Sequence, residues 1–153
     1  MDYNKTLQIL GVLLVWITSP ALAENIDPYD NDSQYAYGEN VGWLNFEPNV
    51  AGPNVGATVS EEKLTGFIWA ENIGWINLWP ENYGGVSNDG AGNLSGYAWG
   101  ENVGWINFDP VVSGDPTDYG VKIDGDGNFS GWAYGQNIGW LNFEPILCVT
   151  GVL

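Results

Sequence analysis

Large apolar and small or polar residues alternate in short stretches along the chain, separated by clusters of glycine, asparagine and aspartate. In residues 97–99, Tyr-Ala-Trp, the large side chains take every second position, and residues 105–108, Trp-Ile-Asn-Phe, follow after a short gap. A period of two is typical of β-strands. The intervening residues 101–104, Glu-Asn-Val-Gly, favour a tight turn because asparagine and glycine tolerate positive φ. This stretch therefore predicts a β-hairpin.

The hairpin pattern recurs four times without gaps, in residues 35–48, 67–80, 97–110 and 132–145. The tryptophans that open the second strand are Trp43, Trp75, Trp105 and Trp140, at spacings of 32, 30 and 35 residues. Such internal identity indicates a repeat architecture. We expect these tryptophans to form the core of each repeat, with a platform for stacking sugars as the alternative role for the aromatic stripe.

A further strand precedes the second, third and fourth hairpins, which gives four units of about 30 residues. The units cover residues 35–48, 55–80, 83–110 and 119–145, and the first lacks its first strand. The predicted fold is all-β: four tandem three-stranded antiparallel meanders. Neither face of the strands is simply polar, so each sheet is expected to pack on both sides. A stacked array is the first prediction and a closed, propeller-like ring is the alternative.

The chain begins with a pattern typical of a secretory signal peptide. Lys5 precedes an apolar run over residues 7–17, and residues 21–23 read Ala-Leu-Ala. This run is shorter than the roughly 20 residues that span a membrane. We therefore expect residues 1–23 to be cleaved, leaving a secreted, extracellular or cell-surface protein that is not inserted in a membrane. Residues 24–34 form an acidic segment before the first hairpin.

Residues 146–153 form an apolar C-terminal strand. By register, Thr150-Gly151-Val152 stands where Tyr119-Gly120-Val121 stands in the fourth unit. This strand can pair with the first unit of its own chain and close a ring, or with that of the next molecule and propagate a filament, which is the favoured prediction. The residues assigned to assembly are Ile146, Leu147, Val149 and Val152. Cys148 is the single cysteine, so it is either a buried apolar group or a partner in an intermolecular disulfide.

The charge balance excludes several functions. Lys and Arg together number 3 against 19 Asp and Glu, the net charge is -16, and histidine is absent. Nucleic acids and anionic membranes need more basic residues than this. Without histidine there is no Ser-His or Cys-His pair. The turn glutamates recur in several copies rather than meeting in one cleft, so we expect no enzymatic activity.

Two recurring acidic features predict calcium binding. Asp124, Asp126 and Asn128 alternate with glycines as in the first half of an EF-hand loop, and Asp89 with Asn93 keeps part of this pattern. The turns contribute Glu39, Glu71 and Glu101, with Gln136 in the fourth unit. The alternative is that the Asp-Gly loops are only tight turns and the glutamates are solvated. The strong negative charge favours the metal.

The core motif Gly-Tyr-Ala-Trp-Gly-Glu-Asn-Val-Gly-Trp-Ile-Asn-Phe, residues 96–108, resembles the tandem repeat of exported bacterial and archaeal proteins of the GYAWSENIGWINF type. This resemblance implies a calcium-associated extracellular repeat or fibre protein. The predicted function is a structural protein that assembles with itself head to tail into a calcium-stabilised filament. The alternative is a secreted carbohydrate-binding module that holds glycans at repeated shallow sites of Trp, Tyr and Asn.

Overall fold

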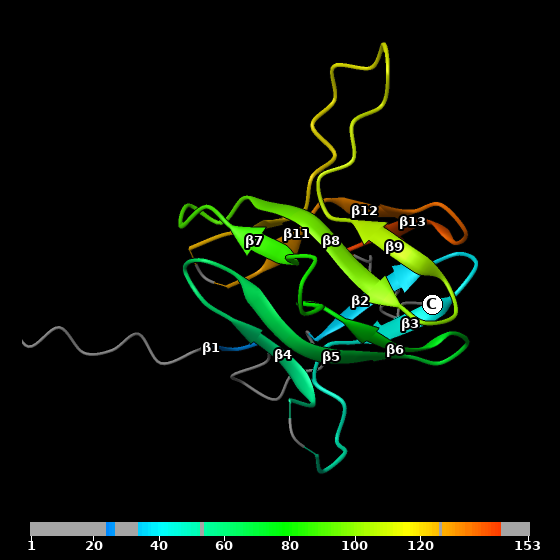
Figure 1. Ribbon diagram of the computed structural model, residues 1–153. Coiled ribbons are helices and arrows are strands. Elements are labelled where there is room, and N and C mark those ends of the chain that lie inside the picture. Colours follow the sequence, from blue (N-terminus) through cyan, green and yellow to red (C-terminus); the bar gives the residue numbers. More distant parts are fainter. Residues whose placement is uncertain (1–23, 27–33, 53, 126, 145–153) are drawn as a thin grey trace, which may run out of the picture.

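The computed structural model describes residues 24–26, 34–52, 54–125 and 127–144. These residues form strands and turns without any helix, which confirms the all-β prediction (Figure 1). It follows that this part of the chain has no helix able to cross a membrane. The predicted signal peptide and the predicted C-terminal strand lie outside these residues. The strands are β1 (Glu24–Asn25), β2 (Tyr35–Gly38), β3 (Gly42–Asn45), β4 (Gly56–Val59), β5 (Leu64–Ala70), β6 (Gly74–Asn77), β7 (Val86–Asn88), β8 (Leu94–Gly100), β9 (Gly104–Asn107), β10 (Lys122–Ile123), β11 (Phe129–Ser130), β12 (Trp132–Gly135) and β13 (Gly139–Asn142).

Four hairpins, one from each unit, close into a ring of eight antiparallel strands. The hairpins are β2–β3, β5–β6, β8–β9 and β12–β13. Neighbouring hairpins pair through β3–β5, β6–β8 and β9–β12, and β13–β2 joins the fourth unit to the first. The predicted stacked array is therefore wrong, and the closed-ring alternative fits. Closure satisfies the backbone groups on both edges of every hairpin, which stacked units would leave exposed.

Each hairpin has the register that its sequence pattern predicts. In the third unit Tyr97 faces Asn107 and Trp99 faces Trp105 across the two strands. Gly104 follows the turn with φ of +80°, a conformation that glycine adopts at little cost. Because successive residues point to opposite faces, Ala98 between the two aromatic residues points inward and is buried.

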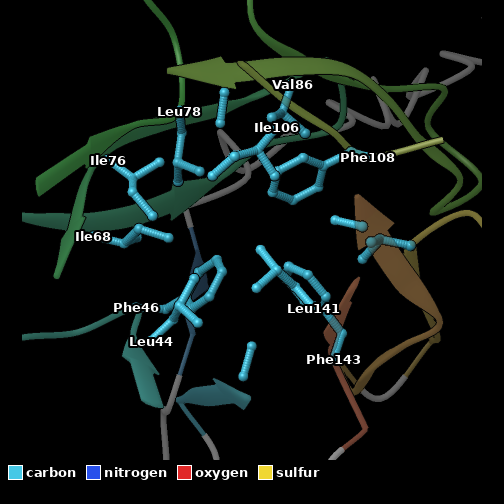
Figure 2. Close-up of a cluster of buried hydrophobic side chains, with 14 of the residues drawn as sticks. Leu44, Phe46, Ile68, Ile76, Leu78, Val86, Ile106, Phe108, Leu141 and Phe143 are labelled. Carbon is cyan, nitrogen blue, oxygen red and sulfur yellow. The ribbon is translucent and has the colours of Figure 1, made fainter. Parts of the chain in front are cut away.

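The ring encloses the hydrophobic core. Small and branched side chains point inward from its strands, and phenylalanines extend the core beyond the strand ends. Figure 2 shows members of this core from different hairpins pointing towards one another. Phe143 lies between two other rings, with centroids 5.4 Å from those of Phe46 and Phe108. The buried hydrophobic residues that point inward from the ring strands are Ala36, Leu44, Ile68, Ala70, Ile76, Ala98, Ile106, Ala133 and Leu141.

Three further hairpins, here called the cap hairpins, cover one end of the ring. They are β4 with the start of β5, β7 with the start of β8, and β10 with β11. They lie side by side, because Asn88 N donates to Glu62 O at 2.8 Å and Ile123 N donates to Gly92 O at 2.8 Å. In Figure 1 the labels β7 and β11 mark this end, opposite the turns of the ring hairpins. The cap hairpins add Leu64, Val86, Leu94 and Val121 to the core.

Candidate binding surface: the outer aromatic belt

The outer face of the ring carries three aromatic side chains and one asparagine from each hairpin. These residues occupy the positions that alternate with the buried ones, so the same period that fills the core also builds this face. We call the set the aromatic belt. Its members are Tyr35, Tyr37, Trp43 and Asn45; Phe67, Trp69, Trp75 and Asn77; Tyr97, Trp99, Trp105 and Asn107; and Trp132, Tyr134, Trp140 and Asn142.

The repeat tryptophans belong to this belt and not to the core, contrary to the expectation from sequence. Trp43, Trp75 and Trp105 are 38%, 37% and 39% exposed, and Trp140 is half-buried. The reason is the width of the ring. Eight strands enclose a space just wide enough for their inward side chains, and alanine, leucine and isoleucine already fill it. The larger rings therefore lie outside.

Each hairpin presents one closely similar cross-strand aromatic pair. The ring centroids are 5.0 Å apart in Tyr37–Trp43, 5.0 Å in Trp69–Trp75, 4.8 Å in Trp99–Trp105 and 5.1 Å in Tyr134–Trp140. The interplanar angles all lie between 62° and 67°, which is an edge-to-face arrangement. The protein thus carries four copies of one aromatic site around the ring.

The belt asparagines are held beside these rings by the backbone. Asn77 Oδ1 accepts from Trp79 N at 3.0 Å, and Asn107 Oδ1 accepts from Asp109 N at 3.0 Å. Asn45 and Asn142 make the same bond two residues onward, at 2.8 Å and 2.9 Å. The backbone thus orients each oxygen, and the side-chain amide N–H groups are donors that can meet a ligand. In the first hairpin Asn45 Nδ2 already donates to Tyr35 Oη at 3.5 Å.

A second set of asparagines links the turns of the ring hairpins into a cycle. Each donates through Nδ2 to a main-chain oxygen in the turn of a neighbouring unit, and all four bonds run in the same direction around the ring. Asn40 donates to Ile138 O at 3.0 Å, Asn137 to Val103 O at 3.0 Å, Asn102 to Ile73 O at 2.9 Å and Asn72 to Val41 O at 3.0 Å. We call this set the asparagine cycle; it fixes the turn end of the ring.

Substitution of Asn102 by alanine is expected to lower the free energy of unfolding by about 1 kcal/mol, because one hydrogen bond between units is lost. Chemical denaturation followed by tryptophan fluorescence measures the change. Glu101→Ala, an exposed neighbour in the same turn, is the matched control and is expected to have little effect. Equal losses in the two variants would show that the asparagine bond contributes nothing specific.

The turn glutamates predicted to bind calcium lie at the same end of the ring. Glu39, Glu71 and Glu101 are exposed, as is Gln136 in the fourth turn. Among the described residues, no three carboxylate, thiol or imidazole groups come together to hold a metal ion. The calcium prediction for these residues therefore stays a prediction.

The predicted Asp-Gly loops form the exposed turns of two cap hairpins. Asp89 Oδ1 accepts from Ala91 N at 2.8 Å and from Asn93 N at 3.0 Å, while Oδ2 accepts from Asn93 Nδ2 at 2.7 Å. Hydrogen bonds from Asn93 and from the backbone hold the pKa of Asp89 below its ordinary value. Asp124 and Asn128 repeat the contacts between Asp89 and Asn93: Asp124 Oδ1 accepts from Asn128 N at 2.9 Å, and Oδ2 accepts from Asn128 Nδ2 at 2.9 Å. These bonds account for the turn geometry; Asp126 lies outside the described residues.

A shallow hollow lies between the second and third cap hairpins. Asp89, Asp109, Asp118 and Lys122 are among its lining residues. Lys122 Nζ donates to Asp118 Oδ2 at 2.6 Å, and this hydrogen bond lowers the pKa of Asp118. Both side chains are largely exposed, at 45% and 63%, so the ion pair adds little to stability.

The fold and the belt define a class of protein: a closed all-β ring of four hairpin units with an outer aromatic surface. Comparison of the chain with protein-family models, curated proteins and solved structures finds no match. The resemblance to the GYAWSENIGWINF repeat proteins therefore stays a prediction. The asparagine cycle was not predicted from the sequence, although its signal was present: the same asparagine recurs in every turn.

Proposed function

We propose that this protein is an extracellular, non-enzymatic carbohydrate-binding protein with four similar shallow sites around the ring. The observation that carries the proposal is the half-exposed aromatic pair that recurs with one geometry in all four hairpins. Exposed apolar surface on a folded protein commonly marks a place of contact with another molecule.

The chemistry of each site suits a sugar. A pyranose ring presents a face of C–H groups, which carry partial positive charge, and a rim of hydroxyl groups. The face of an indole or phenol ring is electron-rich and attracts such C–H groups. The belt asparagine beside the pair supplies N–H donors for hydroxyl oxygens. An aromatic face with a polar group at its edge therefore matches both parts of the ligand.

The charge of the protein narrows the class of sugar. With a net charge of -16, the surface repels uronic acids and sulfated glycans through its long-range field. Neutral sugars, including N-acetylated amino sugars, are not repelled, and amino sugars with a free, protonated amine are attracted. We therefore expect neutral or amino-sugar polymers to be the ligands. Four weak sites on one ring engage a polymer together more strongly than any one of them does alone.

The aromatic pairs also stabilise the sheet, so a test must separate binding from folding. Trp75→Ala removes the face of one of the four pairs, and binding to a neutral or amino-sugar oligosaccharide long enough to engage several sites together is expected to weaken by about threefold to tenfold. Trp75→Phe retains an aromatic face and should bind more strongly than the alanine variant. Calorimetry with chitin and glucan oligosaccharides measures the affinities.

Val111→Ala is the control for this experiment, because Val111 is 86% exposed and lies outside the belt. The thermal unfolding temperature of each variant shows whether a loss of binding reflects a loss of fold. If the intact protein binds no glycan on an array of neutral, amino and acidic sugars, the proposal fails. Binding that survives alanine at all four repeat tryptophans, Trp43, Trp75, Trp105 and Trp140, would place the site elsewhere.

The calcium-stabilised filament stays a prediction beside this proposal. It requires the C-terminal strand to pair with another copy of the chain, and residues 146–153 lie outside the described residues. Sedimentation velocity in EDTA and in millimolar calcium tests it, because growth into large species with calcium, reversed by EDTA, would support the filament over a monomeric carbohydrate-binding protein.

A further inference from the structure

The cap hairpins form an incomplete second tier above the complete ring. The ring has two strands from every unit, whereas the cap strands run in the order β1, β4, start of β5, β7, start of β8, β10, β11. Among the described residues, the first unit contributes only β1 to this row. A first cap strand for that unit would lie between β11 and β1.

The position of β1 shows which part of the first unit is present. Lys63, at the start of the second unit's middle strand, forms a bridge with Ser87 of the next unit. Asn25 pairs with Thr58 in the same antiparallel sense, one unit earlier. Ile26, the next residue, is 9% exposed and joins the core as the leucine after Lys63 does. β1 therefore holds the place of the second cap strand, and no described residue of the first unit holds the place of the first cap strand.

Within the described part of the chain, one main-chain acceptor of the ring has no donor at this place. In three units the residue just after the ring hairpin accepts a main-chain hydrogen bond from the next cap strand: Ala57 N donates to Phe46 O at 2.7 Å, Val86 N to Leu78 O at 3.0 Å and Val121 N to Phe108 O at 2.9 Å. Phe143 holds this position in the fourth unit. No described residue donates a main-chain hydrogen bond to Phe143 O.

A second unused acceptor belongs to the first unit. Gln34 O accepts from Phe46 N at 2.9 Å, as Gly66 O accepts from Leu78 N at 3.0 Å, so Gln34 holds the place of Gly66. Unlike the glycine, Gln34 carries a side chain, and its Oε1 is buried without a hydrogen-bond partner among the described residues. A buried oxygen of this kind is costly unless a donor reaches it. The backbone N–H groups of an added strand would be such donors.

We propose that the C-terminal segment of the same chain, residues 150–153, is this strand and completes the fourth cap hairpin between β11 and β1. In sequence, Gly151-Val152 aligns with Gly120-Val121 of the fourth unit. Val152 N then donates to Phe143 O, and the Val152 side chain enters the core at the place that Val86 and Val121 hold elsewhere. Leu153 takes the half-exposed place of Lys122.

The length of the connection favours the chain's own segment over that of a second copy. The three existing connections join Phe46 to Ala57, Leu78 to Val86 and Phe108 to Val121, which are 11, 8 and 13 residues apart. Phe143 and Val152 are 9 residues apart, within the same range. A tether of this length gives the segment an effective local concentration in the millimolar range, about what short flexible linkers provide. The strand added from a second copy has no such advantage in dilute solution.

Hydrogen–deuterium exchange on the intact protein, followed by mass spectrometry, tests the proposal. Peptides covering residues 146–153 and β11 are expected to be protected, and protection should not depend on protein concentration. Val152→Lys places a charge in the core position, so exchange in both peptides should rise by at least about tenfold. Leu153→Lys adds the same charge at the next residue, which aligns with Lys122 of the fourth unit. This variant should leave exchange unchanged.

Three results would contradict the proposal. Free exchange of residues 146–153 in the unaltered protein would show that the segment does not pair at all. Protection that appears only at high concentration, together with dimers or larger species in sedimentation, would show that a second copy supplies the strand. Equal effects of the two lysine variants would also contradict the register, because only one of them is placed in the core.

Discussion

Replacement of Gly66 by alanine is expected to lower the free energy of unfolding by about 3–5 kcal/mol. Gly66 has φ of +97°, and a Cβ at this position would lie 2.0 Å from the main-chain oxygen of Gly56. That oxygen belongs to the partner strand of the cap hairpin, so it cannot move without breaking the β4–β5 ladder. Urea unfolding of the purified variant measures the loss.

Gly114→Ala is the matched control for this prediction. Gly114 has φ of +83°, and a Cβ there would meet nothing within 4 Å. It therefore carries the backbone cost of about 1 kcal/mol without the steric one. If the two variants lose the same stability, the close approach of β4 to β5 is not what requires glycine at residue 66.

Replacement of Phe108 by alanine is expected to cost about 3–5 kcal/mol, because it empties part of the core where the ring meets the cap hairpins. Phe108 is 2% exposed, and its ring contacts that of Phe143 at 5.4 Å between centroids. Figure 2 shows both rings among the side chains of different hairpins. The loss should appear in urea unfolding as a lower midpoint with an unchanged slope.

The control for the core prediction is an aromatic residue on the surface. Tyr83 is 77% exposed, and its ring lies at the edge of the belt, 5.8 Å from that of Trp105 between centroids. Tyr83→Ala is expected to cost no more than about 1 kcal/mol. A similar cost for Phe108→Ala would mean that the core collapses to fill the space or was loosely packed.

The sequence predicted the hairpins well because their determinants are local. The alternation at Tyr97, Ala98 and Trp99 fixes which side chains share a face, and the Asn-Val-Gly turn fixes the register with Trp105. It did not predict which face is inside. The repeat tryptophans were assigned to the core because large apolar side chains are commonly buried. In a closed ring, however, the inner face has little room, and the small Ala98 side chain lies there.

The sequence also did not predict which hairpins pair with one another. The four units are nearly identical, so each hairpin has the same backbone N–H and C=O groups on its edges in a stacked array and in a closed ring. The choice depends on contacts such as Asn40 to Ile138, which join residues 98 positions apart. The candidate site was predicted in its residue types, Trp, Tyr and Asn, while its exposure follows from ring closure. The metal prediction rests on loops whose Asp and Asn side chains, such as Asp89 and Asn93, bond to each other.

Closure of the ring through β13 and β2 determines when folding can be completed. Of the ring strands, β2 and β3 are synthesised first, yet β2 acquires its second neighbour only when the last hairpin has been made. Pairing between such distant segments is slow, because the chain must lose the entropy of a large loop before the contact forms. Until then the leading edge of the first hairpin stays open to any other strand it meets. A partly synthesised chain is therefore the stage most exposed to aggregation, and the final hairpin is the step that ends this exposure.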